Sequence, residues 1–277
     1  MAEITVHPVL KKIIEGDFQS FFLIAGPCAV ESKEVCISVA VECKSIARTL
    51  GIPYIFKASY IKANRTKKDS FRTIGVDKAL TILRDIREEV DVPITTDIHE
   101  VYDIDLVKDV VDLIQIPAFL SRQTSLIEAA AQTGIPVNIK KGQFMSAASM
   151  KHAAVKAKFD DHHTVLITER GNSFGYSDLI VDMPNIAEMI AYCNQVVMDC
   201  THATQRPNQA SGVTSGNPRD SELLARAALS VGARGLFIET HPNPVEALSD
   251  GSNMIALSEM EGLIGRLHQF STAINQL

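Results

Sequence analysis

Three things are scarce in this sequence: long apolar runs, an excess of basic residues, and cysteines that could pair. The longest apolar stretches, such as Phe21 to Ala25, are far too short to cross a bilayer, so no transmembrane segment is expected. The 27 basic residues are outnumbered by 33 acidic ones, which argues against general nucleic-acid binding. The N-terminus lacks a basic start followed by an apolar run and is not expected to be a signal peptide.

The five cysteines are odd in number, and none of them forms a Cys-x-x-Cys pair. A disulfide framework is therefore not expected, and a reducing, cytoplasmic setting fits better. Cys36, Cys43 and Cys193 lie in helix-like stretches and are expected in the core, and Cys200 is expected to pack there as well.

With 277 residues, 46% of them hydrophobic, the chain suits one (β/α)8 barrel, an α/β architecture of roughly 250 residues. Eight short apolar runs rich in β-branched residues alternate with helix-like stretches, which predicts a closed parallel barrel forming a single domain over residues 1–277. An open doubly wound sheet is the alternative, and it would normally need fewer strands. The expected strands are Phe21–Ala25, Tyr54–Lys57, Ile94–Asp97, Leu113–Ile116, Val137–Lys140, Val165–Thr168, Val196–Asp199 and Gly235–Glu239.

Helical periodicity marks several of the intervening segments, and two connections are long. Residues 1–20 form an N-terminal extension, expected to be a small hairpin that closes the bottom of the barrel. The connections 203–219 and 240–253 follow expected strands and should lie over the catalytic face as lid-like loops. Asp220 is expected to cap one helix. The expected helices include Val76–Glu89, Gln123–Gln132 and Ser221–Val231.

Ionisable and amide side chains gather where the expected strands end. The active site of a barrel lies at the C-terminal ends of its strands, and the interiors of these strands are mainly apolar. A barrel built only for stability would have no reason to place its charges at one end. The strand-end residues are Cys28, Lys57, Ser59, Lys62, Asn64, Arg65, Asp97, His99, Gln115, Lys140, Lys141, Glu169, Arg170, Asp199, His202, Glu239 and His241.

Five of these residues are cations that should converge on one mouth: Lys57, Lys62, Arg65, Lys140 and Arg170. Each alone could be a solvated loop residue, but Lys57 and Lys140 end apolar strands and should point into the barrel. So many cations imply a substrate pair with several phosphate and carboxylate groups. A Schiff-base lysine is an alternative, since Lys140 or Lys57 could serve as the nucleophile of an aldolase.

A second set combines a thiol, an imidazole and two carboxylates from four loops: Cys28, His202, Glu239 and Asp250. Such a mixed site suits Fe²⁺, Mn²⁺, Co²⁺ or Zn²⁺. By spacing alone, Cys28 reads more simply as a small buried hydrophobe. His99 and His241 compete with His202 as ligands, and Cys200 competes with Cys28.

Eight motifs in chain order resemble the 3-deoxy-D-manno-octulosonate 8-phosphate (KDO 8-phosphate) synthase family over roughly residues 20 to 255. That resemblance implies a (β/α)8 barrel, usually a homotetramer, that joins phosphoenolpyruvate to D-arabinose 5-phosphate and releases phosphate for lipopolysaccharide precursor synthesis. The motifs are IAGPCAVES (24–32), FKASYIKANRT (56–66), TTDIHE (95–100), IQIPAFLSRQT (114–124), VNIKKGQF (137–144), ITERGNSFGY (167–176), MDCTHATQ (198–205) and GLFIETHPNP (235–244).

The resemblance also implies roles for individual residues. Arg122 matches a residue that reaches the sugar phosphate of a neighbouring subunit. Cys28 matches the metal-dependent members of the family, whereas the metal-independent members carry Asn at that position. Lys62, Lys140, His202 and Asp250 are the implied catalytic residues, and Asp97 lies with the substrate-binding ones. The implied phosphoenolpyruvate contacts are Lys57, Ser59, Lys62, Gln115, Lys140 and Arg170. The implied arabinose 5-phosphate segment is Asn64, Arg65 and Thr66. The implied metal ligands are Cys28, His202, Glu239 and Asp250.

The sequence departs from the family in a few places, and two other functions compete. Ile61 stands where Asp is usual, Lys67 and Lys68 replace small polar residues, and the loop after Phe144 reads MSAAS rather than Ser-Pro-Gly. The related 3-deoxy-D-arabino-heptulosonate 7-phosphate (DAHP) synthase uses erythrose 4-phosphate and resembles Lys-Pro-Arg-Thr where this chain has Lys-Ala-Asn-Arg-Thr, so Asn64 favours the five-carbon sugar. A non-catalytic phosphosugar-binding barrel would be favoured by loss of a metal ligand, yet all four are present.

Overall fold

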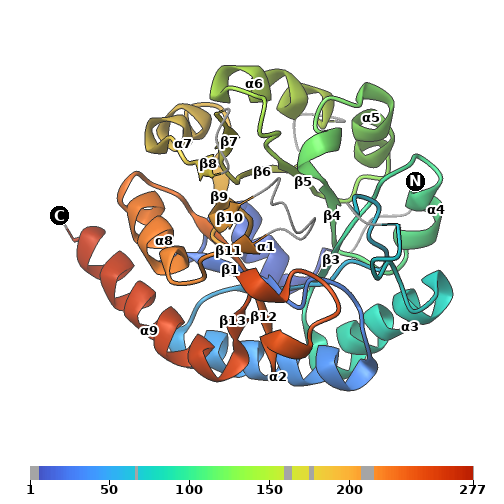
Figure 1. The fold of residues 1–277 in the computed structure, drawn as a ribbon. Helices are drawn as coiled ribbons and strands as arrows, with labels where there is room; N and C mark the ends of the chain where they lie inside the picture. The colour runs from blue at the N-terminus through green and yellow to red at the C-terminus, as the bar shows by residue number, and fades with distance from the viewer. Residues whose placement is uncertain (1–5, 66–67, 159–163, 175–177, 207–214, 277) are drawn as a thin grey trace.

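Eight parallel strands close into a barrel with helices around the outside, as Figure 1 shows along the barrel axis. The computed structural model describes residues 6–65, 68–158, 164–174, 178–206 and 215–276. Each barrel strand pairs with its neighbours, and the last pairs with the first. The expected (β/α)8 fold is confirmed, with strand ends shifted by at most two residues. The strands are β1 Phe22–Gly26, β2 Tyr54–Lys57, β3 Ile94–Asp97, β4 Leu113–Ile116, β5 Val137–Lys140, β6 Val165–Glu169, β9 Gln195–Asp199 and β12 Gly235–His241.

Two glycines let the first strand pack closely against its two neighbours, β2 and β12. A Cβ added at Gly26 would lie 1.9 Å from the backbone oxygen of Lys57, so only glycine fits where β1 ends beside β2. A Cβ at Gly235 would lie 2.4 Å from the ring of Phe22. Both positions lie on the β1–β12 pairing that closes the barrel, in which Phe22 is opposite Gly235 and Gly26 opposite Glu239.

The helices follow the strands in the expected alternation. Ser32 caps the first of the outer helices, its hydroxyl accepting a hydrogen bond from the Val35 amide at 3.2 Å. The expectation for Asp220 is wrong: it is the first residue of its helix, and Arg219 holds the cap position. The outer helices are α2 Lys33–Leu50, α3 Val76–Ile86 with a π-turn at Arg87–Asp91, α4 Asp103–Val107, α5 Thr124–Gln132, α6 Ala147–Lys156, α7 Met183–Ile190, α8 Asp220–Ser230 and α9 Leu257–Ile274.

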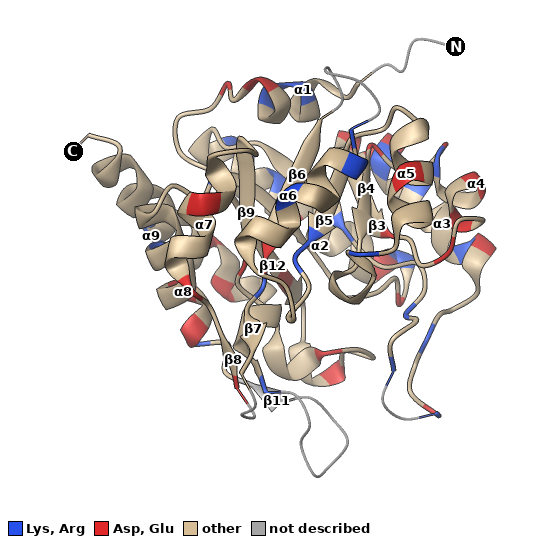
Figure 2. Ribbon diagram, turned by 90° about the horizontal axis from the view of Figure 1, so that it is seen from above, with Lys and Arg blue, Asp and Glu red and all other residues tan. Residues whose placement is uncertain are grey.

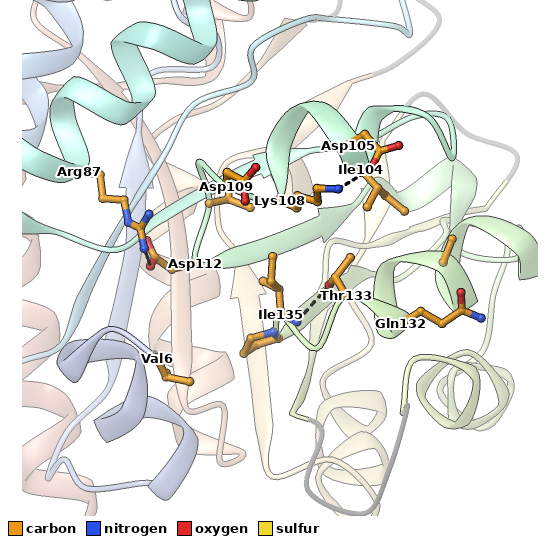
Figure 3. Close-up of a pocket in the computed structure, with 13 residues that line it drawn as sticks. Val6, Arg87, Ile104, Asp105, Lys108, Asp109, Asp112, Gln132, Thr133 and Ile135 are labelled. Atoms are coloured by element: carbon orange, nitrogen blue, oxygen red, sulfur yellow. Dashed lines mark hydrogen bonds and ion pairs between the residues drawn. The ribbon is translucent and has the colours of Figure 1, made fainter. Parts of the chain in front are cut away.

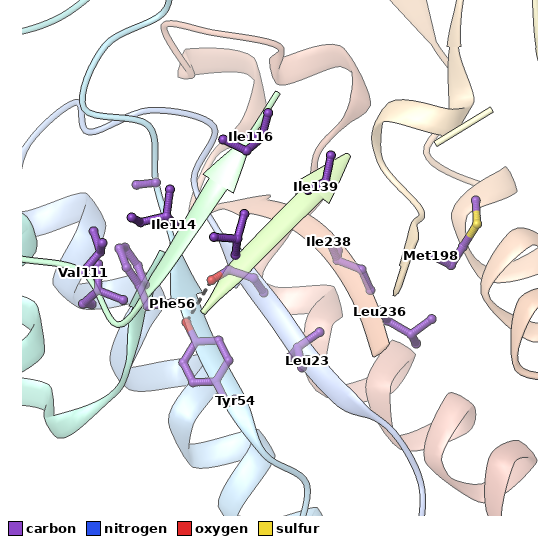
Figure 4. Close-up of a cluster of buried hydrophobic side chains, with 14 of the residues drawn as sticks. Leu23, Tyr54, Phe56, Val111, Ile114, Ile116, Ile139, Met198, Leu236 and Ile238 are labelled. Atoms are coloured by element: carbon purple, nitrogen blue, oxygen red, sulfur yellow. Dashed lines mark hydrogen bonds between the residues drawn. The ribbon is translucent and has the colours of Figure 1, made fainter. Parts of the chain in front are cut away.

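The main core lies between the strands and these helices. Outward-facing strand residues such as Phe56, Ile114 and Leu236 are fully buried there (Figure 4). Tyr54 shares this layer, and its hydroxyl donates to the carbonyl of Ala25 at 3.1 Å. Among the helices that the structure describes, none is both long and apolar enough to cross a membrane.

The N-terminal extension is a helix, α1 Pro8–Glu15, and the expected hairpin is wrong for its described part. His7 caps this helix, accepting from the Val9 amide at 3.2 Å. Leu10 and Ile13 are fully buried against the lower barrel interior. The amphipathic helix α1 thus fills the bottom of the barrel. The short strands β7 Asn172–Ser173 and β11 Ser215–Gly216 lie at the opposite end (Figure 2).

Short elements form the connections at the other end, where the strands finish. The expected lid-like connections contain some regular structure, although residues 207–214 lie outside the described residues. Strand β7 pairs with β8 Leu179–Ile180, and β10 Gln205–Arg206 pairs with β11. The remaining short elements are β13 Ile255–Ala256 and the 3₁₀ turns Ala118–Leu120, His202–Thr204, Pro244–Glu246 and Gly251–Asn253.

Candidate active site

Two adjoining cavities open at the C-terminal end of the barrel, and both are lined by predicted site residues. The inner one reaches down to Lys57, Asp97 and Lys140. The outer one extends towards Arg65 and the segment that carries Asp250. The residues common to both are Lys62, Asn64, Gln143, Arg170 and His202.

A thiol and two carboxylates meet where β1 and β12 end. Ligand atoms of Cys28, Glu239 and Asp250 all lie within 4.8 Å of one another. The Cys28 thiol donates to Asp250 Oδ2 at 3.4 Å and lies 3.1 Å from the Ser249 hydroxyl. Burial raises the pKa of Cys28 to about 12, with Glu239 and Asp250 adding to the effect. The thiol is therefore protonated at neutral pH in the absence of a cation.

His202 lies at the edge of this cluster rather than within it. Its Nε2 is 3.6 Å from Glu239 Oε1, and its Nδ1 is 2.8 Å from Asp199 Oδ2. Asp199 also accepts from the backbone amide of His202 at 2.8 Å, so the carboxylate fixes both the ring and the turn. The structure thus brings together three of the four predicted metal ligands and sets the fourth beside them.

The donor set suits a divalent transition-metal ion. Glu239 is fully buried, and its Oε2 has no hydrogen-bond partner among the described residues. A buried acceptor without a donor is costly unless a cation or a ligand completes it. One thiolate, one imidazole and two carboxylates match the borderline preferences of Fe²⁺, Mn²⁺, Co²⁺ and Zn²⁺.

The rival ligands lie outside the Cys28–Glu239–Asp250 cluster. The His241 ring lies 3.4 Å from Glu31 Oε2 through Nε2, and its Nδ1 accepts from the Asn243 amide at 3.0 Å. His99 lines the inner cavity near Asp103, with 3.8 Å between Nδ1 and the carboxylate. Cys200 is buried, and its thiol lies 3.6 Å from the Met198 carbonyl.

Two lysines from the strand β2 segment share the hydroxyl of Ser59. Lys57 Nζ lies 3.1 Å from Ser59 Oγ and 3.2 Å from Glu239 Oε1, and Lys62 Nζ lies 3.4 Å from Ser59 Oγ. Burial alone would lower the pKa of Lys57, but Glu239 and Asp97 outweigh it and raise the pKa. The pKa of Lys62 is raised in the same way, against its burial, by Cys28, Glu239 and Asp250. Both ammonium groups are charged at neutral pH, which weighs against Lys57 as an amine nucleophile.

Lys140 is held from two sides at the centre of the mouth. Its Nζ lies 2.7 Å from Asp199 Oδ2 and 3.6 Å from the centre of the Phe237 ring. Burial lowers the pKa of Lys140, although Asp199 opposes the shift. Among the site lysines it is therefore the one to test for Schiff-base chemistry.

Arg170 offers free donors to the cavities. Its Nη2 donates to Gln205 Oε1 at 2.9 Å, while Nη1 is buried without a partner among the described residues. A guanidinium nitrogen left in this way is suited to bind a carboxylate or phosphate oxygen.

Behind Lys140 and Arg170 lies a buried ion pair that the sequence analysis did not assign. Lys141 and Glu169 are almost fully buried, with 3.4 Å between Lys141 Nζ and Glu169 Oε1. Glu169 also accepts from the amides of Arg170 at 2.9 Å and Gly171 at 2.7 Å. In each of the consecutive pairs Lys140–Lys141 and Glu169–Arg170, one side chain therefore points into the mouth of the barrel and the other lies behind it. Alternation along a strand could have indicated this from the sequence.

The residues expected to bind substrate are spread around the outer cavity. Arg65 Nη1 donates to the Ser249 hydroxyl at 3.0 Å, and Asn64 lines both cavities. Ser249 was not among the predicted site residues. Thr66 lies outside the described residues. Arg122 is exposed in the turn before α5 and lines neither cavity of the described chain.

Asp97 and Gln115 lie deeper, where β3 and β4 end. Asp97 lines the inner cavity, but Gln115 donates to its Oδ1 and Ser59 to its Oδ2, both at 2.5 Å. Burial alone would raise the pKa of Asp97, but Lys57, Lys62 and Lys140 hold it below its usual range. Asp97 is therefore a buried anion that already accepts two hydrogen bonds.

Another cavity lies near the N-terminal ends of β4 and β5, away from these residues (Figure 3). Its charged lining is largely paired: Arg87 lies 2.7 Å from Asp112, and Lys108 lies 2.6 Å from Asp105. It adds no group to the mouth of the barrel.

A model of the DAHP synthetase I family matches residues 3–276. A protein of Acidithiobacillus ferrooxidans named 2-dehydro-3-deoxyphosphooctonate aldolase is 48% identical over 244 residues, covering 88% of this chain and 87% of that protein. Proteins of the same name from Dichelobacter nodosus and Cyanothece sp. are 45% identical over 267 residues and 44% identical over 274. The match with the Dichelobacter nodosus protein covers 95% of this chain and 96% of that protein, and the match with the Cyanothece sp. protein covers 99% of both.

Proposed function

The chain belongs to the DAHP synthetase I family, and we propose that it is a KDO 8-phosphate synthase. The reaction joins phosphoenolpyruvate, D-arabinose 5-phosphate and water to give 3-deoxy-D-manno-octulosonate 8-phosphate and phosphate. The names of relatives that match nearly the whole chain support this activity over that of a DAHP synthase. Their name also supports a place in lipopolysaccharide precursor synthesis.

The observation that carries the proposal is the gathering of cations around two adjoining cavities. Lys57, Lys62, Lys140 and Arg170 line the inner cavity, and Arg65 lines the outer one. Phosphoenolpyruvate has a carboxylate and a phosphate, and the sugar adds a second phosphate. One cavity for each substrate, joined at the shared residues, would bring the two reacting carbons together.

The chain's own residues then support the following steps. Lys140 and Arg170 hold the phosphoenolpyruvate anion, while Arg65 and Asn64 hold the sugar phosphate. As C3 of phosphoenolpyruvate attacks the aldehyde carbon, the Lys62 ammonium gives a proton to the aldehyde oxygen. Water adds at C2, oriented by His202 and Asp250, and one of its protons replaces the one that Lys62 gave. The new C2 hydroxyl passes its proton to the phosphate as the C2–O bond breaks, which leaves the ketone and inorganic phosphate. The remaining cations, among them Lys57 and Arg170, offset the negative charge throughout.

Cys28, His202, Glu239 and Asp250 are proposed to hold one divalent metal ion, such as Mn²⁺, Fe²⁺, Zn²⁺ or Co²⁺. When bound, the ion would act as a Lewis acid and a template for the aldehyde or a water molecule. The buried, unpartnered Glu239 oxygen supports the site. We expect Cys28→Ala to weaken metal binding about a hundredfold, measured as metal content after dialysis. Cys36→Ala, at a buried cysteine away from the cluster, is the matched control.

The decisive experiment follows the loss of phosphoenolpyruvate absorbance with arabinose 5-phosphate, before and after chelation and with metal restored. Consumption that chelation abolishes and Mn²⁺ or Fe²⁺ restores supports both the substrate and the metal. Consumption that survives thorough chelation contradicts the metal site. Consumption only with erythrose 4-phosphate would identify a DAHP synthase. Trapping of substrate on a lysine by borohydride would reveal a Schiff-base aldolase.

We further propose a cytoplasmic homotetramer of single-domain subunits in which Arg122 reaches a neighbouring active site. Phe119, in the 3₁₀ turn Ala118–Leu120, and Phe144, whose ring lies with Ser121 around Gly142, are 41% and 61% exposed. Exposed aromatic side chains favour contact with another subunit. All five cysteines are unpaired, which supports a reducing compartment. Mixing Arg122→Ala with Lys140→Met tests the shared site. Partial recovery of activity in the mixture is expected, and none is expected if every site is self-contained.

A further inference from the structure

A chain of hydrogen bonds crosses the barrel interior below the active site. Thr168 Oγ1 donates to Asn138 Oδ1 at 2.7 Å, and Asn138 Nδ2 donates to Gln115 Oε1 at 3.1 Å. Gln115 Nε2 then donates to Asp97 Oδ1. All but Asp97 are fully buried. Neither Thr168 nor Asn138 is among the predicted site residues.

The strand register explains why these side chains meet. In the ladder, Asp97 is opposite Gln115, and Gln115 is opposite Asn138. The three therefore lie at one level inside the barrel, on β3, β4 and β5, and Thr168 joins them from β6.

Asp97 sets the direction of these hydrogen bonds. An ionised carboxylate only accepts hydrogen bonds, so Gln115 must turn its nitrogen to Asp97 and its oxygen to Asn138. Asn138 must in turn donate with its nitrogen and accept from Thr168 with its oxygen. The Asp97 carboxylate thus fixes the orientation of both side-chain amides.

Beyond Asp97 the chain continues to the cations of the site. The other Asp97 oxygen accepts from Ser59, whose own oxygen accepts from Lys57 and Lys62. We infer that Asn138 and Thr168 are positioning residues that hold Gln115 and Asp97 in place. Ser59 then keeps the Lys57 and Lys62 ammonium groups facing the inner cavity, where phosphoenolpyruvate is proposed to bind. This inference rests on the proposed function.

The first test removes single hydrogen-bonding atoms without changing shape. Thr168→Val removes the terminal donor, and Thr168→Ser keeps it as the matched control. We expect Thr168→Val to weaken phosphoenolpyruvate binding about tenfold, with the KM for arabinose 5-phosphate unchanged and Thr168→Ser close to wild type. An equal loss for both substrates, or for both variants, would indicate only a loosened barrel and would overturn the inference.

The second test uses pH with Asn138→Asp, which has the same shape. The protonated carboxyl can donate to Gln115 as the amide does, whereas the ionised form cannot. Residue 138 faces Gln115 and Thr168, with Lys140 two residues along the same strand. Phosphoenolpyruvate affinity relative to wild type should therefore be near normal at low pH and fall as the pH rises through the variant's carboxyl pKa. A pH-independent ratio near one, in a folded variant, contradicts the inference.

Titration calorimetry of phosphoenolpyruvate binding to wild type and to each variant distinguishes failure of the proposed reaction from failure of the positioning role. If the wild type binds phosphoenolpyruvate but does not consume it with arabinose 5-phosphate, the proposed reaction fails and the variants are judged on binding alone. If the wild type is active, and Thr168→Val and Asn138→Asp (the latter at high pH) both bind phosphoenolpyruvate as tightly as wild type, the positioning role fails.

Discussion

The lower and upper halves of the barrel interior are built from the same eight strands but have opposite character. The lower half is an apolar layer, in which Phe22, Leu113 and Phe237 form one buried cluster with Leu10 and Ile13 of helix α1. The upper half holds ionised and amide groups, among them Lys140 and Asp199, that are just as deeply buried. Because the strands and their alternation are common to both, the difference shows that side-chain choice along a strand separates folding from chemistry.

The two halves meet at one aromatic ring. Lys140 Nζ lies 3.6 Å from the centre of the Phe237 ring, and Lys57 Nζ lies 5.5 Å from it. The top of the apolar layer therefore also stabilises the lowest cations of the polar one. Variants that change one half and leave the other intact would test how independent the halves are.

The largest expected effect comes from making the upper half apolar. Lys140→Met should keep the fold, since methionine can pack on the Phe237 ring, but should lower kcat/KM about a thousandfold through loss of a buried cation. Steady-state kinetics and circular dichroism would measure the two properties. Lys151→Met, at an exposed position on α6, is the control. A folded Lys140→Met enzyme within tenfold of wild type would refute a role for this cation.

A smaller effect on stability is expected in the lower half. Ile13→Ala leaves a cavity between α1 and the strands and should lower the free energy of unfolding by about 2–5 kcal/mol. Its kcat and KM should remain near wild type at temperatures where the protein is folded. Lys11→Ala, exposed on the same helix, controls for helix propensity. If activity falls while stability does not, the bottom of the barrel is not separate from the site.

The smallest expected effect is a difference between the two halves in how their contribution to stability depends on pH. Asp97 has a lowered pKa in the folded protein, because Lys57, Lys62 and Lys140 outweigh its burial. It therefore contributes stability above the unfolded pKa, about 3.9, and this contribution is lost as the pH falls below that value.

Asp97→Asn should accordingly be less stable than wild type by about 1–2 kcal/mol at pH 7, with a deficit that shrinks towards pH 3. The deficit of Ile13→Ala should stay constant over the same range. Urea unfolding at several pH values measures both. Parallel curves for the two variants would show that the upper half contributes no pH-dependent stability through Asp97.

The strands were predictable from the sequence because each is a short apolar run that is buried on both faces. Helix α1 was not predictable as a helix. It has few residues, and its stability depends on burying Leu10 and Ile13 under a barrel formed by distant strands. The cap at Asp220 was also wrong, because helix ends depend on local backbone geometry that a residue type alone does not specify.

For the site, sequence patterns indicated the cations correctly but not their supporting contacts. Spacing alone favoured Cys28 as a buried hydrophobe, and it is indeed fully buried, yet its thiol also lies beside two carboxylates. The pairing of Lys141 with Glu169, and of Asn138 with Gln115, depends on strand register. Register comes from long-range pairing, which no local pattern in one sequence reveals.

The closure of β12 onto β1 has a consequence for biosynthesis. Cys28 follows the first barrel strand, whereas Ser249, 221 residues later, and Asp250 follow the last. During translation the thiol leaves the ribosome long before its carboxylate neighbours, and it stays without them until the final strand has been made and inserted. The Cys28–Glu239–Asp250 cluster therefore cannot exist in a chain truncated before β12, and its formation would report that the barrel is complete.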